Sequence, residues 1–146
     1  MKLLTFLLLT TLSWADYSSE LAHAYAQRIS DRISSFDQNS HYYATSWQVI
    51  YMADELILKS DTTAQYKKKL KENFMPLLEK FLVDNKASNV SLFSKDGRCI
   101  LSSSSCPKIS LQNGDSLMLD KEMIYAQHRV TNHTRQLIAY LLEAKD

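Results

Sequence analysis

The chain has 146 residues, of which 45% are hydrophobic and 23% charged, so it is large enough for one domain with its own core. Its 17 basic and 16 acidic residues nearly cancel, which excludes the strong positive field that nucleic-acid or anionic-membrane binding needs. Only two glycines and two prolines are present, and this argues against long linkers.

The first fifteen residues, MKLLTFLLLTTLSWA, have the pattern of a secretory signal peptide. Lys2 is their only charge, the apolar run is short for a membrane span, and small residues stand at Ser13 and Ala15. We expect residues 1–15 to be removed and residues 16–146 to form a single periplasmic or secreted domain. The alternative is an uncleaved anchor, and only then would the protein stay attached to a membrane.

Three amphipathic helices are predicted next, over residues 16–36, 41–59 and 63–85, because apolar residues recur there at steps of three and four. Asp37-Gln38-Asn39-Ser40 is predicted to end the first helix, and Ser60-Asp61-Thr62 marks a break rich in capping residues. Pro76 lies inside the third pattern and predicts a kink or a restart there.

Residues 89–106, NVSLFSKDGRCILSSSSC, predict an antiparallel hairpin with strands over 90–95 and 98–103. Asp96-Gly97 is typical of a type I′ turn, in which both central residues have positive φ. Export places Cys99 and Cys106 in an oxidising compartment, so we expect a structural disulfide between them, with two free thiols as the alternative.

The hairpin is followed by a predicted loop that contains Pro107 and Gly114, and then by a strand over residues 122–130. In that strand Ile124, Ala126, His128 and Val130 alternate with the intervening side chains. The run RQLIAYLLE, residues 135–143, suits helix and strand alike, but its place after a strand and a tight corner favours a strand. The predicted fold class is therefore α+β, with N-terminal helices followed by four or five antiparallel strands.

The segment LLEKFLVDNKASNVSLFSKDGRCILSSS, together with the paired strands after it, resembles Cache domains, the extracytoplasmic PAS-like sensors also called PDC domains. The resemblance covers residues 77–143 and implies a PAS/Cache-like sheet in a non-enzymatic domain that binds a small molecule or a receptor partner. Such domains usually feed a kinase, cyclase or chemoreceptor module. None follows here, so we expect any membrane receptor or kinase partner to be a separate protein.

The densest aromatic cluster lies on the second predicted helix and includes Tyr43, Trp47 and Tyr51. Tyrosine and tryptophan join an apolar body to a polar tip, which suits the wall of a small-molecule pocket. We therefore name these three residues, with Tyr125 and Arg129 on a strand, as candidate ligand-binding residues. Packing in the core is the alternative for the helical cluster.

Two further patterns are weaker. The string GDSL at residues 114–117 occurs in a class of serine hydrolases, but there it stands near the N-terminus and is followed by Asp-x-x-His, which is missing here. A nucleophilic Ser116 would also need a base held within hydrogen-bond reach. We therefore expect a turn at GDSL and keep a hydrolase only as a third hypothesis.

The four histidines are scattered, and their spacing shows no third metal ligand, so we expect surface or turn positions, no metal site and no cofactor; they are His23, His41, His128 and His133. The second hypothesis after the sensor-like domain is a structural or protein-interaction module with a filled core and no pocket.

Overall fold

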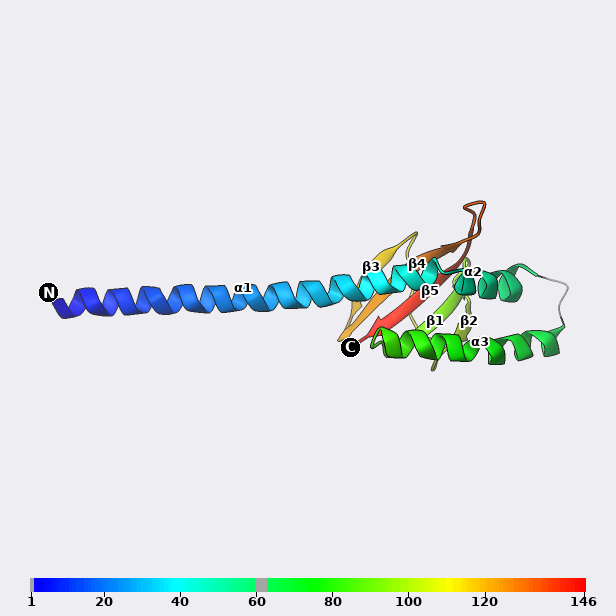
Figure 1. Ribbon diagram of the computed structural model, residues 1–146, viewed down its shortest axis with the longest axis horizontal. Helices are drawn as coiled ribbons and strands as arrows, with labels where there is room; N and C mark the ends of the chain where they lie inside the picture. Colours follow the sequence, from blue (N-terminus) through cyan, green and yellow to red (C-terminus); the bar gives the residue numbers. More distant parts are fainter. Residues whose placement is uncertain (1, 60–62) are drawn as a thin grey trace. The chain divides into compact units, whose positions relative to one another are not determined.

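The computed structural model describes residues 2–59 and 63–146, with side chains from Tyr17 onward. The chain divides after Ser35 into two compact units, and the second unit, residues 36–146, contains the sheet and its helices (Figure 1). In the part of the chain that the structure describes, no helix has both the length and the apolarity to cross a membrane. The side chains of the predicted signal segment lie outside the described residues, so that segment stays a prediction.

The first helix, α1 (Lys2–Ala44), continues past the point where the sequence predicts its end. The predicted stop at residues 37–40 is wrong because their polar side chains, which usually compete with the helical backbone, have distant partners instead. Asp37 contacts His128, and Asn39 donates to Asn85. The helix ends just before Thr45 and Ser46, whose hydroxyl groups donate to carbonyl oxygens one turn back.

The second helix, α2 (Trp47–Ala53), leads into a π-helical turn, η1 (Asp54–Leu58). The third, α3 (Ala64–Asp84), is capped by Thr63, whose hydroxyl oxygen accepts from the backbone N–H of Tyr66. It is continuous through Pro76, so the predicted restart is wrong, and apolar side chains on both sides of Pro76 pack on the same core. The predicted break at residues 60–62 lies outside the described residues.

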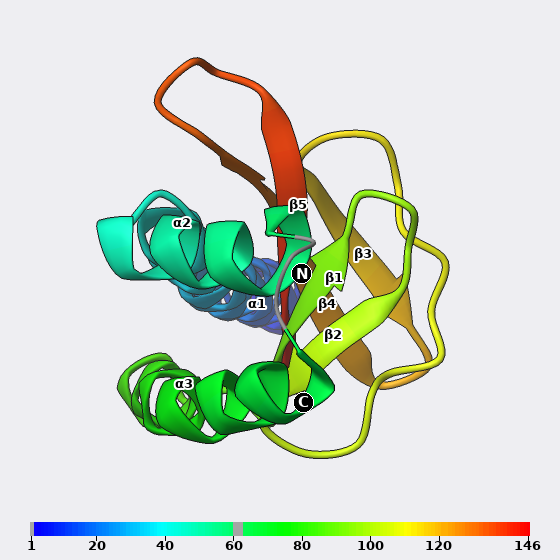
Figure 2. The ribbon, with the colours of Figure 1, turned by 90° about the vertical axis from the view of Figure 1, so that its right-hand side faces the viewer.

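Five antiparallel strands follow in the order β2-β1-β5-β4-β3, so the C-terminal strand is central (Figure 2). The predicted α+β class is confirmed, and the run predicted as a strand over residues 135–143 does form one, over Leu137–Lys145. The sequence predicts a loop where β3 lies, because the mixture of exposed and half-buried side chains in β3 gives no clear alternation. The bounds are β1 (Asn89–Ser94), β2 (Cys99–Ser102), β3 (Ser116–Asp120), β4 (Met123–Thr131) and β5 (Leu137–Lys145).

The hairpin between β1 and β2 is present, but its turn differs from the prediction. Gly97 has φ 89°, whereas Asp96 is not among the residues with positive φ. The carbonyl of Ser94 accepts from the N–H of Gly97 at 3.0 Å, and the N–H of Ser94 donates to the carbonyl of Arg98 at 2.8 Å. This is a three-residue loop that ends in a left-handed glycine, so the type I′ assignment is wrong.

The sheet has two apolar faces. Helices α2 and α3 and the end of α1 cover one face, which we call the helix-side core; it includes Leu92, Val130 and Leu141. On the opposite face Phe93, Tyr140 and Leu142 pack under the loop between β2 and β3 (Figure 2); we call this cluster the loop-side core.

Cys99 and Cys106 form a disulfide, as predicted, which is consistent with an oxidising extracytoplasmic compartment. The serine run between them is ordered by Asn89, whose side-chain oxygen accepts from the hydroxyls of Ser102 and Ser103. The edge of the sheet is therefore fixed both covalently and by hydrogen bonds.

Replacing both cysteines in Cys99→Ser/Cys106→Ser should lower the free energy of unfolding by about 2.5 kcal/mol, because the unfolded chain regains the entropy of the closed loop. Denaturant unfolding in non-reducing buffer measures this difference. Reductant should destabilise the parent protein to the same extent and leave the double variant unchanged. Equal midpoints for parent and variant would contradict a stabilising role.

Candidate functional site

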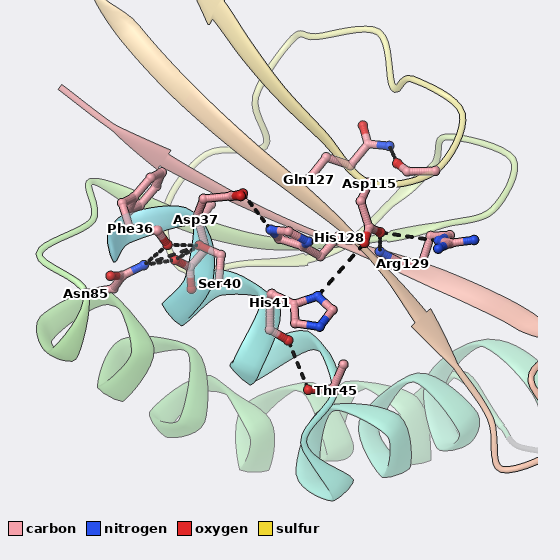
Figure 3. Close-up of polar contacts among 12 residues, drawn as sticks. Phe36, Asp37, Ser40, His41, Thr45, Asn85, Asp115, Gln127, His128 and Arg129 are labelled. Atoms are coloured by element: carbon pink, nitrogen blue, oxygen red, sulfur yellow. Dashed lines mark hydrogen bonds and ion pairs between the residues drawn. The ribbon is translucent and has the colours of Figure 1, made fainter. Parts of the chain in front are cut away.

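The last turns of α1 present polar side chains to the helix-covered face of the sheet. Asp37, Ser40 and His41 have the spacing of one helix face, and they meet side chains from β4, β5 and the loop before β3 (Figure 3). We call this group the polar seam; its members are Asp37, Ser40, His41, Asn85, Asp115, His128 and Glu143.

Glu143 is the fully buried centre of the seam. Its Oε2 atom accepts from the Ser40 hydroxyl at 2.6 Å and from the Asn85 amide at 2.5 Å, while Oε1 has no hydrogen-bond partner among the described residues. Burial raises the pKa of Glu143, although hydrogen bonds from Ser40 and Asn85 and the proximity of His128 act in the opposite direction. One carboxyl group thus joins α1, α3 and β5.

His128 is buried beside it on β4, with a side chain that is 6% exposed. Its Nε2 atom lies 2.8 Å from Asp37 Oδ1. Because a carboxylate only accepts hydrogen bonds, the neutral imidazole carries its proton on Nε2 and leaves a lone pair on Nδ1. Nδ1 lies 3.6 Å from Asp115 Oδ2 and has no hydrogen-bond partner among the described residues.

Asp115 is held in place by its neighbour across the β3–β4 pair. Its Oδ1 atom accepts from the backbone N–H of Arg129 at 2.8 Å and from Arg129 Nε at 3.3 Å. Desolvation acts to raise the pKa of Asp115, but the Arg129 backbone bond, His128 and the Arg129 guanidinium together lower it. The other oxygen, Oδ2, faces His128 and lies 3.9 Å from His41 Nδ1 (Figure 3).

The three helical candidates for ligand binding have different surroundings. Tyr43 stacks on Phe81 with ring centroids 4.1 Å apart and packs against the helix-side core. For this residue the structure therefore shows core packing, which was the alternative to ligand binding. Trp47 is 72% exposed, and the half-exposed Tyr51 meets the edge of Phe74.

The two candidates on β4 also lie apart. Tyr125 packs in the loop-side core, on the face away from the helices, and Arg129 is paired with Asp115. The structure therefore does not gather the five predicted ligand-binding residues around one point, and ligand binding by them stays a prediction.

The predicted surface positions are confirmed for His23, His41 and His133, whereas the surface position predicted for His128 is wrong because this side chain is buried. The signal was available: His128 alternates with Ala126 and Val130, which are fully buried, so it belongs to the inward-facing set of β4. What the sequence did not reveal is that residues 37, 41 and 115 converge on it.

The GDSL string contributes its aspartate to the seam. Ser116 begins β3 opposite Gln127, and no described hydrogen bond joins its side chain to a histidine. The contact to His128 comes from Asp115 instead. A nucleophilic serine therefore gains no support from the geometry.

Comparison with known proteins leaves the family open. No family model matches the chain, and no curated protein matches it. The resemblance to Cache domains therefore stays an interpretation of residues 77–143.

Glu143→Gln should stabilise the protein near neutral pH. Because the folded-state pKa is raised above the ordinary value of 4.5, the parent has its full stability below that pH and loses part of it as pH rises through the folded-state pKa. The variant lacks this loss, so its advantage in denaturant unfolding should appear above pH 4.5 and grow toward neutrality. Glu79→Gln, on the exposed side of α3, is the matched control; a pH-independent difference for Glu143→Gln would contradict the assignment.

Proposed function

We propose that this chain is an exported, non-enzymatic binding domain of the sensor type, with its ligand site in the polar seam. The observation that carries the proposal is the buried Nδ1 atom of His128, which has no hydrogen-bond partner among the described residues and faces the accessible pair His41 and Asp115. An orphaned polar atom in a buried position is unfavourable unless a water, an ion or another ligand pairs with it.

The seam also offers a route from ligand to conformational change. The imidazole that would contact the ligand through Nδ1 holds α1 through Nε2 and Asp37. A ligand on Nδ1 makes the Nε2 proton more acidic and strengthens the bond to Asp37, so it favours the arrangement in which residues 36–44 are docked on the sheet. By this linkage the ligand selects one arrangement of helix and sheet, and a separate membrane receptor or kinase would read it.

Two independent features support a location outside the cytoplasm. The leader-like first fifteen residues favour export, and the Cys99–Cys106 disulfide fits an oxidising environment. The resemblance of residues 77–143 to Cache domains agrees with extracytoplasmic sensing of a small ligand.

A second candidate function, a protein-interaction module, is favoured by the aromatic side chains on the outside of the helices. Tyr42 and Trp47 are both more than two-thirds exposed, and Tyr51 is half-exposed. Tyrosine and tryptophan are enriched at protein interfaces because they combine large apolar area with a polar group.

A thermal-shift panel separates the two functions. Amino acids, carboxylates, amines, purines and divalent cations are tested on the purified protein, and at least one class should raise the melting temperature, because a ligand at 100 times its Kd stabilises the folded state by about 2.7 kcal/mol. The shift should be lost in His41→Gln, an exposed position, and kept in His133→Gln, the exposed control. If no class gives a shift, the sensor proposal fails and the interaction module is favoured.

A further inference from the structure

We infer that His41, Asp115 and His128 form a binding site for a divalent first-row transition metal ion, supported by Asp37. A metal ion would be the ligand of the polar seam, so a signalling role for the ion rests on the proposed function. Metal binding itself can be measured directly.

The donor set has the composition and spacing of a metal site. One ligand atom from each of the three residues lies within 4.8 Å of the other two. Asp115 Oδ2 is 3.6 Å from His128 Nδ1 and 3.9 Å from His41 Nδ1. Tetrahedral Zn²⁺ with bonds of about 2.0–2.1 Å separates its ligand atoms by about 3.3–3.4 Å, so a small inward movement of the exposed His41 closes the site.

The alternative to a metal ion between His128 and Asp115 is a second proton on the imidazole of His128. A doubly protonated His128 would lie between the carboxylates of Asp37 and Asp115, but the 3.6 Å from Nδ1 to Oδ2 exceeds the 2.7–3.2 Å of an N–H···O hydrogen bond. Two metal bonds of about 2.0–2.1 Å at a tetrahedral angle hold ligand atoms about 3.3–3.4 Å apart, which is closer to the observed 3.6 Å. The separation is therefore long for a direct hydrogen bond and leaves an ion pair or a bridging cation, which the metal titration below separates.

The residues next to the three ligands orient them, as the residues around metal ligands commonly do. Asp37 accepts from His128 Nε2 at 2.8 Å, which fixes the tautomer with Nδ1 free and orients the ring, as in carboxylate–histidine–zinc triads. Arg129 occupies only Oδ1 of Asp115 and leaves Oδ2 for the ion. The Arg129 side chain is 55% exposed, so solvent weakens, but does not remove, the repulsion between its charge and a bound cation.

The site is accessible to an ion from solvent and leaves one coordination position of the ion open. The side chains of His41 and Asp115 are 57% and 35% exposed, so one side of the site faces solvent, while His128 forms its buried wall. Three protein ligands with a fourth position for water are typical of zinc sites that exchange ligands. Two imidazoles and one carboxylate suit Zn²⁺, Cu²⁺, Ni²⁺ or Fe²⁺ better than Ca²⁺ or Mg²⁺, which prefer oxygen ligands.

The test measures metal binding by the purified protein after chelator treatment and dialysis. Titration calorimetry with ZnCl₂ should give one ion per chain, CaCl₂ and MgCl₂ should give no heat of binding, and Co²⁺ should give the visible absorption of a tetrahedral N/O site. His41→Gln and Asp115→Asn should abolish binding, and Asp37→Asn should weaken it by about 10–100-fold because it acts on the ligand His128. His133→Gln and His23→Gln are the matched controls and should bind as the parent does.

Circular dichroism checks that each variant is folded. His128→Asn should also abolish binding; should this buried variant be unfolded, the exposed His41→Gln variant decides the outcome. Absence of Zn²⁺ binding by the parent, or equal binding by the parent and His41→Gln, overturns the metal site. If an organic compound instead raises the melting temperature in a His41-dependent way, the metal inference fails and the proposed function stands. If neither metal nor organic compounds bind, both fail.

Discussion

The placement of the helices on the sheet depends on one buried carboxyl group. Glu143 lies on the central strand β5 without exposed surface, and a single oxygen accepts from Ser40 on α1 and from Asn85 at the end of α3. A buried carboxyl group is costly unless it is hydrogen-bonded, and among the described residues Oε2 supplies the bonds of Glu143 while Oε1 has no partner. Apolar contacts alone would permit helices to shift along the sheet, whereas these two directed bonds fix the position of both helix ends.

The β1–β2 edge of the sheet and the docked end of α1 are stabilised by different kinds of interaction. At the β1–β2 edge a loop is held by a disulfide and by the Asn89 side chain, and neither of these interactions involves a titratable group. At the α1 edge the bonds run through imidazole and carboxyl groups, whose strength changes with protonation or with a bound cation. Protonation or a bound cation therefore changes the contacts of residues 36–44 and leaves those of the disulfide-linked loop unchanged.

Local patterns predict the elements well and their contacts poorly. Alternation and turn chemistry identify the hairpin, the β4 and β5 strands and the disulfide, because each signal lies within a few residues of sequence. The continuation of α1 and the seam depend on pairs such as Asp37 with His128 and Ser40 with Glu143, which are 91 and 103 residues apart. No spacing rule reports such contacts. The polar run at residues 37–40 predicts a helix stop because its local chemistry is that of one, and only its distant partners make it helical.

Hydrogen exchange of the backbone amides in residues 36–44 tests the central claim most directly. In the Asp37→Ala/Ser40→Ala double variant the seam loses the contact of Asp37 with His128 and that of Ser40 with Glu143, and we predict much faster exchange in residues 36–44 while β1 and β5 keep their protection. Unchanged protection of residues 36–44 would show that apolar packing alone holds this helix end, and would contradict a role for the polar seam in docking α1 on the sheet.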